Sequence, residues 1–285
     1  MKVMNRIQRN YYCLIAGLPD IVMDQRKISF TLSEFKNELQ DTLHKDDYKL
    51  IELLFLSYDN VNLLNLLLKN DKPYNSLGKY TRDELEVEIK EPEFIEEYLK
   101  VFIEDFKASG GTENEQSWEN QLTQLYLDYV QNVSNPFLKD WFSFEKTLKN
   151  VLTAYNCKKH QLSMDDNLIG DGDIVETLKK SHARDFGLSS EVDYIEKLIS
   201  IIENKNLFDR EKNIDLLKWN YLDELTTFHY FSIEAVLSFM IKLIVLNRWM
   251  ELDKETGKEL FKKFLYDLKT TYKFPIEFNI YERRK

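Results

Sequence analysis

Pro136–Tyr155 reads PFLKDWFSFEKTLKNVLTAY, an apolar helical run that carries Lys149 and Asn150 near its centre. Two other stretches have the same character, namely Tyr58–Lys69 (YDNVNLLNLLLK) and Ser238–Trp249 (SFMIKLIVLNRW). Each places asparagine, with lysine, arginine or aspartate close by, inside a leucine-rich helix. The copies follow one another at intervals of roughly 90 residues. This spacing predicts three similar helical units arranged around one centre.

Such a plan fits a scaffold or socket better than a single catalytic pocket. Buried polar side chains need hydrogen-bond partners or water, and a shared polar cavity would provide both. We therefore predict that Asn62, Lys149, Asn150 and Arg248 line a central polar cavity and bind a partner there. The alternative is that the three stretches are merely similar leucine-rich helices, and periodicity alone leaves both interpretations open.

The composition favours helices over sheets. The 285 residues are 43% hydrophobic and 31% charged, with only 8 glycines and 5 prolines. We expect an all-α protein that forms one compact helical body, with approximate units at residues 1–80, 81–170 and 171–285. The net charge of −10 argues against nucleic-acid binding, because phosphates require a basic face.

The targeting features are few. Met1–Asn10 is polar and basic and does not resemble a secretory signal. Ile233–Met250 is the most apolar helix, but its charged residues predict that it does not span a membrane. Cys13 and Cys157 indicate two free thiols in a reducing cytosol, although a single disulfide stays open. The sequence thus predicts a cytoplasmic protein that reaches a membrane only through partners.

Local signals place the helices. Thr31 and Glu34 form a capping-box pattern, and Asn135-Pro136 suits a helix start. Phe94, Tyr98, Phe102 and Phe106 predict one apolar helical stripe. Helices are expected over about residues 11–18, 31–43, 94–106, 116–133, 136–155, 174–180, 191–204, 213–230, 233–250 and 254–272. Residues 46–69 are expected to form one long helix or two helices joined near Asp59-Asn60.

No catalytic motif is present. The four histidines lack metal-ligand spacing, and nucleophile, P-loop and dinucleotide motifs are absent. We therefore expect no catalytic residues, metal or cofactor. Gly170–Asp173 is interpreted as a structural turn rather than a calcium or phosphate loop. The acidic stretch Asp83–Asp105 is either a solvated helix face or a docking surface for a basic partner helix.

Some residues resemble a known family. The opening Tyr11–Asp20 (YYCLIAGLPD) resembles the start of an uncharacterised bacterial family encoded in V-type (A/V-type) ATPase gene clusters, at the place expected for the C subunit, which is called d in eukaryotes. Phe142–Asn150 (FSFEKTLKN) resembles the recurrent helix of the C subunit, with weaker counterparts around Asn62 and Arg248. The third stretch departs from the pattern, since Lys242 stands where a carboxylate is expected.

The resemblance implies a wholly helical funnel with three-fold pseudo-symmetry. It further implies a non-catalytic rotor-coupling subunit of a V-type ATPase, with the central-stalk subunits and the membrane rotor ring as partners. One rival is a helical metal-dependent enzyme of ferritin-like or terpenoid-synthase type, and another is a generic helical adaptor. The direction of ATP turnover, the coupling ion and the oligomeric state of the isolated chain are left open by the sequence.

Overall fold

The computed structural model describes residues 9–23, 25, 28–111 and 115–251, and within them every regular element is a helix. The helix expected at 254–272 lies outside the described residues, as does the segment Phe274–Phe278, for which the sequence predicts an extended conformation. The helices are α1 (Tyr12–Gly17), α2 (Leu32–Thr42), α3 (Lys45–Leu67), α4 (Arg82–Lys90), α5 (Glu97–Ala108), α6 (Glu115–Gln131), α7 (Pro136–His160), α8 (Asp173–Lys180), α9 (Ile195–Ile202), α10 (Leu207–Thr226) and α11 (Ile233–Glu251).

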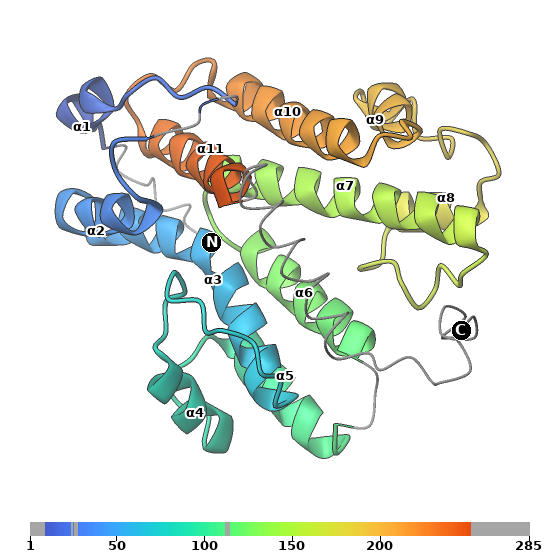
Figure 1. The fold of residues 1–285 in the computed structure, drawn as a ribbon, viewed down its shortest axis with the longest axis horizontal. Helices are drawn as coiled ribbons and strands as arrows, with labels where there is room; N and C mark the ends of the chain where they lie inside the picture. The colour runs from blue at the N-terminus through green and yellow to red at the C-terminus, as the bar shows by residue number, and fades with distance from the viewer. Residues whose placement is uncertain (1–8, 24, 26–27, 112–114, 252–285) are drawn as a thin grey trace, which may run out of the picture.

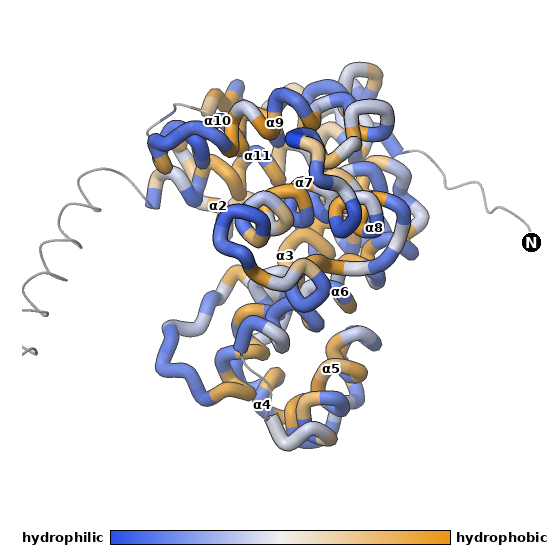
Figure 2. Tube along the Cα trace, turned by 90° about the vertical axis from the view of Figure 1, so that its right-hand side faces the viewer, coloured by the Kyte–Doolittle hydropathy of each residue, from blue (hydrophilic) through white to orange (hydrophobic). Residues whose placement is uncertain are grey.

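The long helices cross near the middle of the molecule. In Figure 1, α3 and α6 descend from the centre to a lower lobe that α4 and α5 complete, whereas α2 and α7–α11 form the upper part. The view turned by 90° shows the same two parts, with hydrophobic and hydrophilic residues alternating along the helices (Figure 2). Helix α3 packs against α2, α4, α6 and α11, which makes it the element that joins the two parts.

Buried aromatic side chains hold the lower lobe together. Phe102 of α5 and Trp118 of α6 are almost fully buried and meet edge to face, with ring centroids 5.8 Å apart. Phe106 packs against the same indole at 4.9 Å. Aromatic pairs of this kind add to the free energy of burial by about 0.5–1.5 kcal/mol each. The α5–α6 contact is therefore a rigid support for one side of the molecule.

The predicted aromatic stripe is wrong at one position. Phe94 lies before α5 and is 79% exposed. Pro92 separates α4 from α5, and the Glu88 carboxylate accepts hydrogen bonds from the backbone nitrogens of Glu93 (2.7 Å) and Phe94 (3.1 Å). Because these groups form a turn, Phe94 cannot join the helical row that Tyr98, Phe102 and Phe106 continue.

Among the helices that the structure describes, α3 is the one whose length and apolar composition would allow it to cross a membrane. Half of its apolar stretch is nevertheless buried within the protein, and Ile51, Phe55 and Leu63 are fully enclosed. This burial is typical of the central helix of a folded core.

The two cysteines are not joined. Cys13 is exposed on α1, whereas Cys157 is buried near the end of α7. Of the two possibilities left open by the sequence, the free thiols are the ones observed.

The capping box at the start of α2 is confirmed. Thr31 Oγ1 accepts a hydrogen bond from the Glu34 nitrogen at 3.1 Å, and Glu34 Oε2 accepts one from the Thr31 nitrogen at 2.7 Å. We expect Thr31→Ala to lower the free energy of unfolding by about 1 kcal/mol, because the Glu34 nitrogen loses its acceptor and the Glu34 carboxylate loses the hydroxyl that donates to it. Urea unfolding measures this change. The control Ser33→Ala, at an exposed position in the same turn, should stay within about 0.5 kcal/mol of the wild type.

Candidate functional site

An apolar groove of about 560 Å³ lies where the long helices meet. Helices α3, α6, α7 and α11 form its walls, and α10 contributes one lysine. Its apolar lining includes Leu54, Val61, Leu64, Leu122, Ile241 and Ile244. Val61 is 57% exposed, so apolar surface inside the groove is open to a binding partner. We name this feature the central groove.

Three charged side chains lie on the α7 side of the central groove. Glu145 and Lys149 occupy consecutive turns of α7, and Lys218 reaches them from α10. Lys218 Nζ lies 2.9 Å from Glu145 Oε1 and donates a hydrogen bond to Oε2 at 3.3 Å. Lys149 forms no ion pair within the described residues, although Glu119 of α6 also lines the groove.

Lys149 is held in an apolar setting. Its Nζ donates one long hydrogen bond, to Thr123 Oγ1 at 3.5 Å. Burial lowers the pKa of the ammonium group, and the negative charges of Glu119 and Glu145 partly oppose this effect. Of the four residues predicted to line a shared cavity, Lys149 is the one that the structure brings to the central groove.

Asn62 and Asn150 do not line the groove, in contrast to the prediction. Each buried amide instead binds the backbone of the loop that follows its helix. Asn62 Nδ2 donates to the Asn75 carbonyl at 2.9 Å, and its Oδ1 accepts from the Asn75 nitrogen at 2.9 Å. Asn150 makes the same pair of bonds with Ile169, both at 2.8 Å. A side-chain amide can accept from the backbone N–H of a residue and donate to its C=O at the same time. Each asparagine therefore fixes its loop to its helix, and we call this pair of bonds a loop clamp.

Arg248 is also placed away from the central groove. It forms an ion pair with Asp215 of α10, a carboxylate that is only 2% exposed. Trp249 Nε1 donates to the same Asp215 Oδ2 at 2.6 Å. Arg248 therefore neutralises a buried charge between α10 and α11, because an unpaired buried carboxylate would be strongly unfavourable. Partner binding by Asn62, Asn150 or Arg248 stays a prediction.

A second buried carboxylate fixes the loop between α3 and α4. Asp59 Oδ2 accepts from the Lys79 nitrogen at 2.7 Å and Oδ1 from the Tyr80 nitrogen at 3.1 Å. Gly78 is essential here, because a Cβ atom at this position would lie 2.2 Å from Asp59 Oδ1. Burial raises the pKa of Asp59 to about 6, although both backbone bonds and Lys36 act in the opposite direction.

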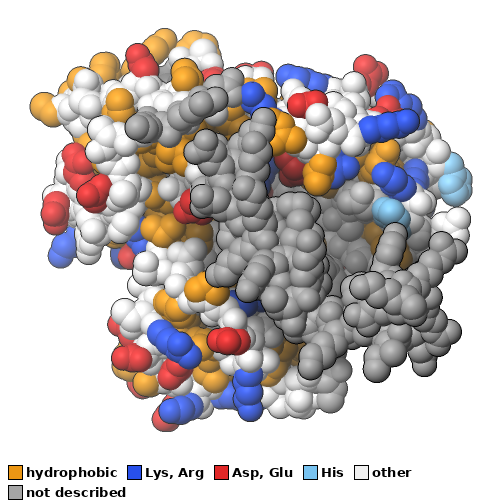
Figure 3. All heavy atoms as spheres, viewed as in Figure 1, with side chains coloured by type: hydrophobic (Ala, Val, Ile, Leu, Met, Phe, Trp, Pro, Cys, Tyr) orange, Lys and Arg blue, Asp and Glu red, His pale blue; other side chains and the backbone are white. Residues whose placement is uncertain are grey.

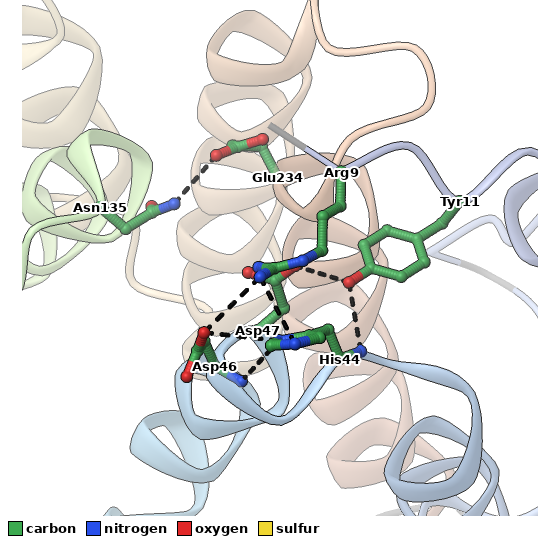
Figure 4. Close-up of polar contacts among 7 residues, drawn as sticks. All are labelled: Arg9, Tyr11, His44, Asp46, Asp47, Asn135 and Glu234. Carbon is green, nitrogen blue, oxygen red and sulfur yellow. Dashed lines mark hydrogen bonds and ion pairs between the residues drawn. The ribbon is translucent and has the colours of Figure 1, made fainter. Parts of the chain in front are cut away.

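Another polar cluster fastens the N-terminal segment (Figure 4). The Tyr11 hydroxyl donates to Asp47 Oδ2 at 2.5 Å, and Arg9 lies 3.5 Å from the same carboxylate. Nearby, Asn135 Nδ2 donates to Glu234 Oε1 at 2.9 Å, which joins the start of α7 to the start of α11. The Tyr11 nitrogen also donates to the Phe231 carbonyl at 2.7 Å. Arg9 and Tyr11 of the opening segment are therefore held against α3 and the segment before α11.

The residues described by the structure contain no group of three or more His, Cys, Asp or Glu side chains placed as metal ligands. Gly170 and Gly172 have φ values of +85° and +121°, as a structural turn requires. Sequence reasoning missed Glu145, Lys218 and Thr123 as groove residues. The Glu145–Lys149 spacing of four residues was a signal for one shared helix face, whereas nothing local pointed to Lys218.

Comparisons with known proteins place the chain among proteins without an assigned activity. A family model described as "Protein of unknown function (DUF2764)" matches residues 8–271. An uncharacterized protein of Chlamydia muridarum (strain MoPn / Nigg) is 20% identical over 240 residues, which cover 81% of this chain and 88% of the relative. No solved structure matches.

The resemblance to the C subunit of V-type ATPases is contradicted by these findings. The matching model is that of DUF2764, and the relative carries no functional description, so neither points to that subunit. The short helical signatures that suggested the resemblance consist of leucine with asparagine and charged residues. Two of their asparagines are explained by loop clamps inside this fold.

Proposed function

The chain belongs to the DUF2764 family of proteins of unknown function, and we propose that it is a non-catalytic coupling subunit that binds a helix of a partner in the central groove. The observation that carries this proposal is the apolar groove itself. Its walls come from four helices, and a partner helix with an apolar face would extend their packing.

A coupling role also requires a second contact surface. Tyr12, Phe228, Tyr230 and Phe231 are 41–85% exposed and gather where α1 meets the joint between α10 and α11. Figure 3 shows hydrophobic side chains collected at this corner. Exposed aromatic side chains that adjoin one another are typical of protein interaction surfaces. This aromatic patch is our candidate for the second surface.

The proposed architecture behind this role is a three-unit helical funnel. Its support comes from three helical hairpins, α2–α3, α6–α7 and α10–α11. The second helix of each hairpin contains one of the asparagine-bearing stretches and contributes to the central groove. We propose that these hairpins are the centres of the units expected at 1–80, 81–170 and 171–285.

We propose to test this role in a V-type ATPase. There the protein would couple the central stalk to the membrane rotor ring. Two properties support that assembly: the helical body is acidic, and its groove suits a helix. A cytoplasmic position at the membrane surface is part of the same proposal.

The test is purification of the tagged full-length protein from its own host in mild detergent. We expect stoichiometric partners with the wild type and their loss with Val61→Glu, because a carboxylate in an apolar groove opposes helix binding. The matched control is Val87→Glu on α4, since Val87 is equally exposed (60%) but lies outside the central groove. This variant should retain the partners.

The identity of the partners decides the assembly. Recovery of V-type catalytic, stalk and ring subunits would support rotor coupling. Partners of another kind that depend on Val61 would support a different coupling role. If the wild type and Val61→Glu retain the same partners, helix binding in the central groove is ruled out.

A further inference from the structure

Lys149 has an unusual position among the lysines of the central groove. Lys218 pairs with Glu145 at 2.9 Å, and Lys72 pairs with Glu115 at 3.4 Å. Lys149 has the long bond to Thr123 at 3.5 Å and forms no ion pair within the described residues, although the charges of Glu119 and, more weakly, Glu145 act on it from farther away. The groove therefore presents one incompletely satisfied cation against apolar walls.

This arrangement is unfavourable in the free protein. A partly dehydrated ammonium group loses hydration energy that a single long hydrogen bond does not restore. Glu145 is engaged by Lys218, and Glu119, an exposed carboxylate of α6 that also lines the groove, forms no ion pair with Lys149. A carboxylate that enters the groove would supply the missing acceptor. Charge complementarity thus specifies one chemical feature of the occupant.

The dimensions of the groove specify a second feature. Its lining on α3 extends from Leu54 to Asn65, and on α6 from Glu115 to Leu127. At 1.5 Å per residue these walls are about 16–18 Å long, which corresponds to three turns of a helix. We propose that the partner is a helix whose apolar face carries one glutamate or aspartate that pairs with Lys149. This inference rests on the proposed function and names the partner's chemistry.

Two synthetic helical peptides of about 18 residues test the inference. Both have a leucine and alanine face, and they differ by a central Glu or Gln. Binding to the full-length protein is measured by calorimetry. We expect the Glu peptide to bind about 10-fold more tightly, since a charged hydrogen bond contributes about 1.5 kcal/mol. Lys149→Met should abolish this preference.

A matched lysine on the same helix provides the control. Lys146 is paired with Asp128 at 3.6 Å and lies outside the central groove. Lys146→Met should keep the full preference for the Glu peptide. Thermal melting confirms folding of both variants, and we expect no loss with Lys149→Met because it removes a poorly solvated charge.

The outcomes separate the inference from the proposed function. Equal binding of both peptides to the wild type would overturn the carboxylate inference and leave helix binding intact. Binding of neither peptide would overturn both. Laurate, a fatty acid with one carboxylate, tests a small amphiphile as the occupant. If it displaces the Glu peptide, binds more tightly and depends on Lys149, the helix inference is overturned. A photo-crosslinker at Val61 that joins residues 252–285 of the same chain despite excess Glu peptide would also overturn the inference.

Discussion

Replacing Asn150 by alanine should lower the free energy of unfolding by about 3 kcal/mol. Asn150 and Ile169 are both 2% exposed, so neither the nitrogen nor the carbonyl of Ile169 can turn to water when the amide is removed. Each unsatisfied buried group costs about 1–3 kcal/mol, and loss of the side chain adds a small cavity. The loop that precedes α8 would lose two buried hydrogen bonds to α7.

Chemical denaturation of the full-length protein measures this effect. The matched control is Asn247→Ala, which changes the same residue type in the corresponding stretch of α11. Asn247 is partly exposed and donates to Glu251 at 2.8 Å, so we expect a change of no more than about 0.5 kcal/mol. A loss of no more than about 0.5 kcal/mol for Asn150→Ala as well would show that the Ile169 bonds do not stabilise the fold.

Helix starts could be predicted from the sequence because the signals are local. Asn135 caps α7 by accepting from the Leu138 nitrogen at 3.0 Å, and Pro136 occupies the first turn. Thr31 and Glu34 behave in the same way at α2. Such caps depend on residues within four positions of one another, so a single sequence contains the necessary information.

The candidate site could be predicted less well, and helix geometry explains part of the failure. Lys149 and Asn150 are consecutive residues, which point about 100° apart around an α-helix. They cannot both line one narrow groove. The structure turns Lys149 toward α6 and Asn150 toward Ile169.

Long-range partners explain the rest. Arg248 pairs with Asp215, and Lys218 with Glu145, across separations in sequence that no local pattern specifies. The sequence indicates that a polar side chain within an apolar helix needs a partner, but it does not say whether that partner is solvent, a loop or another helix. Those contacts are set by the packing of α7, α10 and α11.

Asp59 should make the stability of the protein depend on pH between about 4 and 6.5. Its pKa is raised from 3.8 to about 6 in the folded protein, mainly by burial. In this range the folded state binds more protons than the unfolded state, so the free energy of unfolding falls as pH rises. A shift of about two units corresponds to roughly 3 kcal/mol, present below pH 4 and lost once pH exceeds the folded pKa.

The ionisation acts on the attachment of the lower lobe. Asp59 binds the backbone of Lys79 and Tyr80, and the side chains of both residues contact Glu96 at the start of α5. Lys36 lies on the other side and donates to the carbonyls of Leu77 (2.7 Å) and Gly78 (3.0 Å). The charge balance at Asp59 therefore bears on how firmly the loop before α4 is held.

Comparison of the wild type with Asp59→Asn isolates this contribution. Other carboxylates titrate alike in both proteins, so their effects cancel in the difference between the two unfolding free energies. We expect that difference to change by about 3 kcal/mol in favour of Asp59→Asn between pH 4 and 7, whatever its starting value. Asp41→Asn, at an exposed position near the end of α2, should keep the wild-type profile. A difference that stays constant from pH 4 to 7 would mean that Asp59 has the same pKa in the folded and unfolded chains. Burial would then not disfavour its charged form.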